Sequence, residues 1–252
     1  MNDKARVHAG LNTGNMLEFY DQATQERVLV MSPLYFDDDF IGGGHSAGVP
    51  AAGSPTAGYP WVKKIVGAAP PTVALVSNGA GGQIACTLTA TSEKQDAALY
   101  WNDSLSIDVT KGAVFQARAQ LSVLPSAAGV EVVIGLQSVW IDGPDNAAEF
   151  VRFFAKANGT IYMASYDGTT LTTASTGLTV ATTEWHNYRI DCTDVTDIKF
   201  FIDGNQYNTK GQFAFAATGA AAVLQPYTSA YKPSGTGVAT LTLDAVSVWN
   251  FR

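Results

Sequence analysis

Alternation of apolar and polar side chains is the feature that most limits what this chain can fold into. In the segment 114–123 (VFQARAQLSV) every second side chain is apolar, from Phe115 to Val123. The segments 188–192 and 198–202 repeat this period of two. A period of two is typical of a β-strand with one face on the core and the other in water. The sequence therefore predicts an all-β protein.

Turn signals separate these predicted strands. Asn-Gly and Asp-Gly pairs favour tight hairpins, because both residue types tolerate the left-handed backbone conformation that such turns need. Many short strands with regular turns indicate a sandwich or a barrel. The pairs occur at 78–79, 158–159, 167–168 and 203–204.

The 252 residues divide into two parts by pattern. Residues 1–35 are predicted to form an N-terminal arm with one hairpin, between 16–20 and 27–31. Residues 36–252 are predicted to form one large sandwich, because such domains often reach about 200–250 residues. Within it, positions 42–60 are rich in Gly, Ala, Ser and Pro. They are either a long surface loop or an extended segment ordered against a neighbouring subunit.

Charge excludes some partners. The chain has 15 Lys and Arg against 22 Asp and Glu, a net charge of -7. Nucleic acid and anionic membranes bind clustered cations, so neither is an expected partner. The polar N-terminus predicts no secretory signal, and no apolar stretch reaches the roughly 18 residues of a membrane helix. Cys86 and Cys192 are either two buried thiols or one disulfide.

From residue 36 onward the sequence resembles the concanavalin A-like lectin/glucanase superfamily. This resemblance implies a jelly-roll sandwich of two antiparallel sheets, one of them concave. It also implies that 114–123 and 131–136 form a central strand pair. The resembling segments are Phe36–Phe40 at the first strand, 114–123 with 131–136, Trp185–Ile190 with Ile198–Gly204, and Leu241–Trp249 at the closing strand.

The layout of the whole chain is also similar to structural proteins of tailed-bacteriophage particles with this fold. The similar parts are an N-terminal NxLxFYD pattern, the FDDDF motif at 36–40, the Gly-rich loop and the segment 224–237. This resemblance implies a virion protein assembled in the host cytoplasm. Its expected partners are the major capsid protein or other virion proteins, and copies of itself, with a trimer favoured.

Catalytic residues are not expected. Glucanases of this superfamily carry alternating acids on one concave strand, because two carboxylates must face one sugar. The matching strand, 131–138, has a single acid, Glu131. The histidines are dispersed at His8, His45 and His186, which disfavours a zinc site. A serine hydrolase is disfavoured because no nucleophile elbow is present.

Two kinds of binding site are candidates. No cofactor is expected, although a structural Ca²⁺ is an alternative, since relatives of this fold bind one near the first and closing strands. Its ligands would be Asp37, Asp38, Asp39 and Asp244, which otherwise cap turns in water. Surface glycan would stack on exposed aromatic side chains, which otherwise pack in the core. The aromatic candidates are Tyr59, Trp61, Tyr100, Trp101, Trp140 and Phe201.

We therefore expect a non-enzymatic virion structural protein, most specifically a capsid decoration or cement protein that binds the shell through its arm and loops. A carbohydrate-binding module on a virion appendage is the alternative. A glycoside hydrolase is the third hypothesis. Decoration, head-fibre, portal-proximal and tail positions all remain open at this point.

Overall fold

A computed structural model describes residues 7–9, 17–19, 34–41, 60–182 and 184–251. Its main body is two antiparallel sheets of eight strands each, packed face to face. This confirms the predicted jelly-roll sandwich. Within the described ranges there is no α-helix, and so no helix that could span a membrane.

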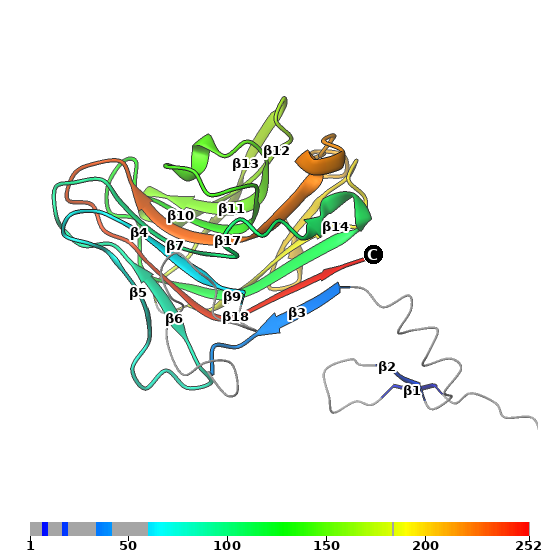
Figure 1. Ribbon diagram of the computed structural model, residues 1–252, viewed down its shortest axis with the longest axis horizontal. Helices are drawn as coiled ribbons and strands as arrows, with labels where there is room; N and C mark the ends of the chain where they lie inside the picture. Colours follow the sequence, from blue (N-terminus) through cyan, green and yellow to red (C-terminus); the bar gives the residue numbers. More distant parts are fainter. Residues whose placement is uncertain (1–6, 10–16, 20–33, 42–59, 183, 252) are drawn as a thin grey trace, which may run out of the picture.

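We call the two layers the concave sheet and the convex sheet, after the curvature of their outer faces (Figure 1). In spatial order the concave sheet contains β13 (Leu171–Thr179), β12 (Thr160–Tyr166), β11 (Phe150–Lys156), β10 (Glu131–Gln137), β17 (Val223–Lys232), β7 (Gln95–Tyr100) and β4 (Val62–Val66), with β8 (Ile107–Asp108) on β17. The convex sheet contains β16 (Asn205–Gln206), β15 (Lys199–Ile202), β14 (His186–Cys192), β9 (Ala113–Val123), β18 (Thr240–Asn250), β6 (Ile84–Thr87) and β5 (Thr72–Leu75), with β3 (Leu34–Asp38) on β18.

The predicted pairing of 114–123 with 131–136 is wrong. The first segment is β9, which lies between β14 and β18 in the convex sheet. The second is β10, which lies between β11 and β17 in the concave sheet. The connection between them therefore crosses from one layer to the other. Each sheet needs its own central apolar strand, and the sequence pattern does not say which sheet a strand joins.

The predicted faces of the convex strands are confirmed. Phe115 and Leu121 of β9 are buried, whereas Val123 at the strand end is 39% exposed. β14 and β15 form the predicted hairpin, in which Ile190 lies opposite Phe200. Both of these side chains are fully buried between the sheets. The predicted closing strand is β18, the neighbour of β9.

Two of the predicted turns have the left-handed backbone at both central residues. Asn158 and Gly159 have φ of 70° and 73°, and Asp203 and Gly204 have φ of 52° and 80°. The second pair joins β15 to β16 with no other residue between them. Asn-Gly and Asp-Gly suit this conformation because Gly has no Cβ and the short polar side chains tolerate it.

The N-terminal hairpin between 16–20 and 27–31 stays a prediction. β2 (Leu17–Phe19) pairs with β1 (Val7–Ala9), and 27–31 lies outside the described residues. β3 starts at Leu34, close to the predicted boundary at 36. Of the predicted loop 42–60, only Pro60 belongs to the described part of the chain.

The two cysteines are free thiols, which decides between the two predicted alternatives. Cys86 on β6 and Cys192 on β14 are both fully buried. Burial raises the pKa of each thiol above its ordinary value. Both therefore stay protonated at neutral pH and pack as small apolar side chains.

Candidate functional site: a polar row beneath a strap

Strand β10 carries the start of the candidate site. Its side chains alternate between the two faces of the concave sheet, and Ile134 and Leu136 pack in the central core. Glu131, Gly135 and Gln137 therefore lie on the concave face. This is the face on which carbohydrate-active members of the resembling superfamily are expected to work.

Gly135 makes room for a cation on the next strand. It lies opposite Arg152 of β11 in the sheet register. A Cβ at position 135 would come within 2.6 Å of the Arg152 Cα and 2.8 Å of its Cβ. Since such contacts are closer than atoms can pack, only glycine fits there. Position 135 thus allows a buried arginine to rise from the middle of the sheet.

A strap, residues 138–149, covers this part of the concave face. It connects β10 to β11 and contains a short 3-10 turn, Pro144–Asn146. Figure 1 shows this segment inside the hollow of the concave sheet. Beneath and beside it is a second apolar cluster, separate from the central core. Its buried members are Val62, Ala98, Tyr100, Val133, Ala147, Phe150, Phe154, Ala164 and Tyr227.

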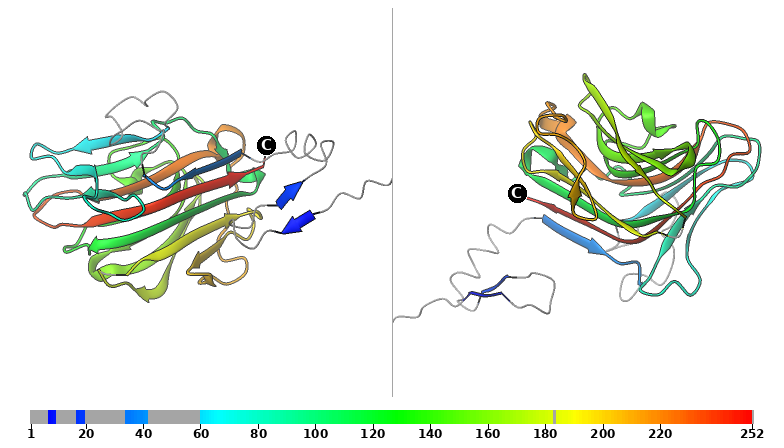
Figure 2. Two further views of the ribbon diagram at one scale, coloured as in Figure 1. Left: turned by 90° about the horizontal axis from the view of Figure 1, so that it is seen from below. Right: turned by 180° about the vertical axis from the view of Figure 1, so that it is seen from behind.

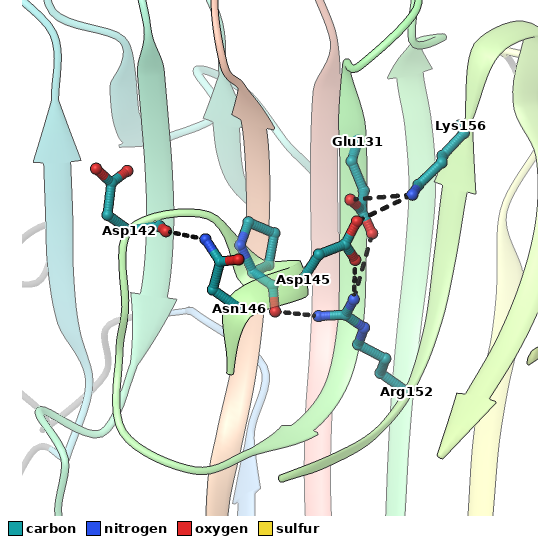
Figure 3. Close-up of polar contacts among 7 residues, drawn as sticks. Glu131, Asp142, Asp145, Asn146, Arg152 and Lys156 are labelled. Carbon is teal, nitrogen blue, oxygen red and sulfur yellow. Dashed lines mark hydrogen bonds and ion pairs between the residues drawn. The ribbon is translucent and has the colours of Figure 1, made fainter. Parts of the chain in front are cut away.

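Arg152 fastens one end of the strap. Its guanidinium donates 2.7 Å from Nη1 to the carbonyl oxygen of Pro144, and Nη2 binds the carboxylate of Asp145 (Figure 3). The same Nη2 lies 3.6 Å from Oε1 of Glu131. Lys156 binds Asp145 at 3.0 Å. The side chains of Arg152 and Glu131 are only 2% and 4% exposed, whereas those of Lys156 and Asp145 are 44% and 56% exposed, so the cluster is buried at the sheet and open to water at the strap.

The two acids of this cluster shift in opposite directions. Burial raises the pKa of Glu131 to about 7, although the charge of Arg152 limits the rise. Burial also acts on Asp145, but the charges and hydrogen bonds of Arg152 and Lys156 outweigh it and hold the pKa of Asp145 below its ordinary value. Arg152 is therefore paired mainly with Asp145 of the strap, and Glu131 can hold a proton near neutral pH.

Trp140 fastens the other end of the strap. Its indole Nε1 donates to Oδ2 of Asp96 on β7 at 2.9 Å, and its backbone N–H donates to Oδ1 of Asp103 at 2.7 Å. Lys64 on β4 lies 4.3 Å from the centre of the Trp140 ring. Burial raises the pKa of Asp96 to about 7, and the Trp140 hydrogen bond opposes this rise.

Glu131 and Asp96 lie on strands that are not neighbours in the concave sheet. In the register, Tyr231 of β17 lies between them, opposite both residues. Strands in a sheet are about 4.8 Å apart, so the two backbones are separated by about 10 Å. A retaining glycosidase needs carboxyl groups about 5–5.5 Å apart and open to substrate. Glu131 is 3% exposed and Asp96 is fully buried.

Several side chains under the strap keep unused polar atoms. Among the described residues, these buried atoms have no hydrogen-bond partner. We call these side chains the polar row. Because buried polar groups normally have hydrogen-bond partners, the polar row has spare capacity to bind water or a small polar group. The atoms are Oδ1 of Asp96, Oε1 of Glu131, both amide atoms of Gln137, Nε of Arg152, the Tyr227 hydroxyl and Oγ of Ser229.

The predicted aromatic candidates do not gather at one site. Trp61 and Trp101 are buried in the central core, 6.1 Å apart between ring centres. Tyr100 is buried in the second cluster. Phe201 lies on the convex sheet beside Arg189, and Tyr59 lies outside the described residues. Trp140 alone among the candidates lies in the strap, where it is half-buried over the concave face.

Three of the predicted metal ligands have other partners. Asp244 is paired with Arg118 at 2.6 Å. Asp38 and Asp39 accept hydrogen bonds from the backbone of Phe40 and Ile41. Across the part of the chain that the structure describes, there is no group of three or more acidic, histidine or cysteine side chains that could hold a metal ion. His186 is bound to Asp203 at 2.6 Å, in a turn of the convex sheet.

The structure adds residues that the sequence analysis did not single out. Asp96, Gln137 and Arg152 lie in strands whose other residues are mostly apolar, and all three are buried. A charged residue within such a strand, as in FVRFFAK at 150–156, is the available sequence signal, because burying it requires a partner. The partners, Asp145 and Pro144, are in a loop whose position no sequence pattern predicts.

Comparison with known proteins identifies the fold. No protein-family model and no curated protein match the sequence. Among solved structures, an endo-β-1,4-glucuronan lyase from the fungus Trichoderma reesei has a TM-score of 0.58 at 16% identity, over 87% of this chain and 95% of that chain. A laminarinase from Rhodothermus marinus has a TM-score of 0.55 at 17% identity, over 88% and 99%. The Emp47p carbohydrate recognition domain has a TM-score of 0.52 at 11% identity, over 80% and 94%.

These similarities show a concanavalin A-like jelly roll. The three proteins are, by name, a lyase, a laminarinase and a carbohydrate recognition domain. One architecture therefore carries catalytic and non-catalytic functions. At these identities the comparison shows the fold alone, so function has to be argued from the residues of this chain.

Proposed function

We propose that this protein is a non-enzymatic structural protein of a bacteriophage virion, most specifically a decoration or cement protein on the capsid. The observation that carries the proposal is the closed concave face. The strap is fastened there by Arg152 at one end and by Trp140 at the other. The acids beneath it are too buried to reach a polymer in water.

The composition of β10 supports a scaffold over an enzyme. Glu131 is the single acid on this strand, and its neighbour Arg152 is already bound to the strap. A glycosidase needs a second carboxyl group within reach of the same sugar. Asp96, the other buried acid of the row, is held by Trp140 and lies two strands away.

The phage part of the proposal comes from the sequence layout, above all the FDDDF motif at 36–40, the Gly-rich loop and the segment 224–237. We propose that the protein is assembled in the host cytoplasm and binds the shell through residues outside the concave face. Symmetric shells present repeated sites, so a homo-oligomer, with a trimer favoured, suits this role.

Carbohydrate binding is the second candidate. It is favoured by Trp140, which is half-buried in the strap, and by the unused polar atoms beneath it. Glycan binding at this row would require the strap to leave Arg152 and Asp96. The expected signature is therefore weak binding that increases when the strap is loosened, for example in Lys94→Ala, which removes the 2.5 Å contact to Asp142.

Immunogold labelling of purified phage particles tests the proposal. Antibody against the protein should label the capsid surface at regular density, and antibody pre-absorbed with the protein should not. Detection of the protein only in the soluble fraction of the phage lysate, with no label on the particles, would contradict the proposal. So would turnover of β-glucan or polyuronate by the wild-type protein that Glu131→Gln abolishes.

A further inference from the structure

Strand β3 lies at the rim of the convex sheet. It pairs with β18 from Leu34 opposite Asn250 to Asp38 opposite Val246, and it pairs with no other described strand. Figure 2 shows β3 (blue) beside the closing strand β18 (red). Main-chain groups of a strand point alternately to its two edges, so part of the N–H and C=O groups of β3 point away from β18.

A strand added beside β3 would lie in line with β5. β6 and β3 pair with successive parts of β18, at 240–243 and 246–250. β5 covers the outer edge of β6, and no described strand covers that of β3. An added strand beside β3 would therefore extend the row that β5 begins.

An apolar hollow of about 430 Å³ lies between the end of β3 and the turn that joins β5 to β6. Ile41, just after β3, is 61% exposed, and Leu75 at the end of β5 is 40% exposed. This volume is large enough for an apolar side chain. The hollow is lined by Phe40, Ile41, Leu75, Val76, Gly79, Gly81, Gly82 and Gln83.

The hollow has a fixed wall. Gly82 has φ of +83°, and a Cβ there would lie 2.4 Å from the carbonyl oxygen of Asp39 and 2.6 Å from the backbone nitrogen of Ile41. The backbone after β3 thus packs directly on the turn between β5 and β6. The edge and the hollow are held together as one surface, which reduces the entropy lost on binding.

The edge is acidic. Asp37 and Asp39 are exposed, and none of Asp37, Asp38 and Asp39 forms an ion pair with another described residue. Burial and then the charges of Asp39 and Asp38 raise the pKa of Asp37. These carboxylates repel one another, and a cationic partner would relieve the repulsion.

We propose that the outer edge of β3 binds an extended segment of a partner protein as an added strand, with Lys or Arg opposite Asp37 and Asp39 and an apolar side chain in the hollow beside Ile41. The inference rests on the proposed function for the identity of the partner, a protein of the virion shell. The contact would combine main-chain pairing with side-chain selection, as in other strand-addition complexes.

A second copy of this chain is the less suitable occupant. Two β3 edges side by side would bring two sets of Asp37, Asp38 and Asp39 together. Like charges opposite one another destabilise a strand pair, and charged edges are a common means of preventing self-association. The same acids that disfavour a copy favour a cationic strand.

Two capped six-residue peptides test the inference, one alternating lysine and valine and the other alternating glutamate and valine. We expect the intact protein to bind the lysine peptide at least tenfold more tightly at about 50 mM salt, where charge screening is weak. Amide hydrogen exchange should slow within 34–38 when the peptide is bound. Equal binding of both peptides, no binding, or protection elsewhere would overturn the inference.

Three variants sharpen the test. Asp37→Lys should weaken binding of the lysine peptide about fivefold or more. Ile41→Asn, which removes the apolar side chain without adding charge, should weaken both peptides. Glu184→Lys makes the same charge change at an exposed position on the β13–β14 turn and should bind like the wild type. If the wild-type protein sediments as a dimer and Asp37→Lys changes that dimer, the edge binds a second copy of this chain. That result would overturn the choice of partner. Because the peptides do not depend on the virion, failure here is separable from failure of the immunogold experiment.

Discussion

The concave face and the β3 edge use the same kinds of side chain in opposite ways. Under the strap, Asp96 and Glu131 are buried. Trp140 of the strap binds Asp96, and Arg152 beside Glu131 binds Pro144 of the strap. At the edge, Asp37 is exposed and its charge is unpaired within the described ranges. The first region directs its polar groups inward and holds the fold together, whereas the second directs them outward.

This difference shows why a familiar fold does not fix a function. The concave face is where carbohydrate would be sought in a concanavalin A-like jelly roll, and here the protein itself occupies it. The acids beneath the strap should therefore govern stability, and those at the edge should govern binding. Four experiments can break or sharpen that division, and they follow in order of expected effect.

The largest effect is expected from Arg152→Ala. At about pH 8, where Glu131 is ionised, removing the cation leaves this buried carboxylate without its nearer ion partner and releases Asp145 and the Pro144 carbonyl. Loss of one partner from a buried pair costs about 3–5 kcal/mol. Urea unfolding should report this loss in the free energy of unfolding. Recovery of part of it in Glu131→Gln/Arg152→Met would confirm that the charge is responsible, and a loss below about 1 kcal/mol would contradict the buried-cluster account.

The next effect is a dependence of stability on pH. The pKa of Glu131 and of Asp96 is raised to about 7 in the folded protein, against about 4.3 and 3.9 in an unfolded chain. The folded state therefore holds more protons between these values, and the free energy of unfolding should fall as pH rises from about 4 to 7. Each group contributes on the order of 3 kcal/mol, and the loss is complete above the folded pKa.

Asp96→Asn/Glu131→Gln is the matched control for this pH dependence. The amides imitate the protonated acids, so the variant should equal the wild type at about pH 3.5, below both unfolded pKa values, and exceed it near pH 7.5. Chemical unfolding at several pH values within this window measures the difference. If the free energy of unfolding changed with pH in the same way in both proteins, neither acid would titrate where its burial predicts.

A smaller effect is expected from Trp140→Phe. Phenylalanine keeps one aromatic ring but removes the five-membered ring whose Nε1–H donates to Asp96 at 2.9 Å. A buried acceptor without its donor costs about 1–3 kcal/mol. The loss should be local, with faster amide hydrogen exchange in 138–149 than in β9. Uniform acceleration across both sheets would show that the strap and the sandwich open together.

The smallest effect on stability is expected from Asp37→Lys. The side chain is exposed and makes no ion pair with a described residue, so the free energy of unfolding should change by about 0.5 kcal/mol or less. Thermal or urea unfolding measures this. A loss comparable with that of Trp140→Phe would break the comparison, because the edge would then be part of the fold's own stabilisation.

Local pattern predicts the strands well, and their assignment to sheets poorly. The alternation in 114–123 and the Asp203-Gly204 turn are properties of neighbouring residues, and both predictions are confirmed. The pairing of that segment with 131–136 fails because it depends on which layer each strand joins. Contacts between distant strands carry no periodic signal in a single sequence.

The candidate site was less predictable than the fold. Glu131 was noted as a single acid, and Trp140 as one aromatic among six. Arg152 approaches Glu131 only when β10 and β11 pair, and Asp96 meets Trp140 only when the strap folds over the sheet. Exposure separates the aromatic candidates, as the buried Trp61 shows, and exposure depends on packing that composition cannot report.

Gly135 limits which mutations the concave face can accept. Any side chain at this position would place its Cβ 2.5 Å from the Val151 carbonyl oxygen and 2.6 Å from the Arg152 Cα, so it would push β11 and its buried cation away from β10. A smaller residue at 152 keeps both of these backbone atoms, so it should not rescue a substitution at 135. In a collection of descendants of this chain, position 135 is therefore expected to stay glycine whichever residue stands at 152.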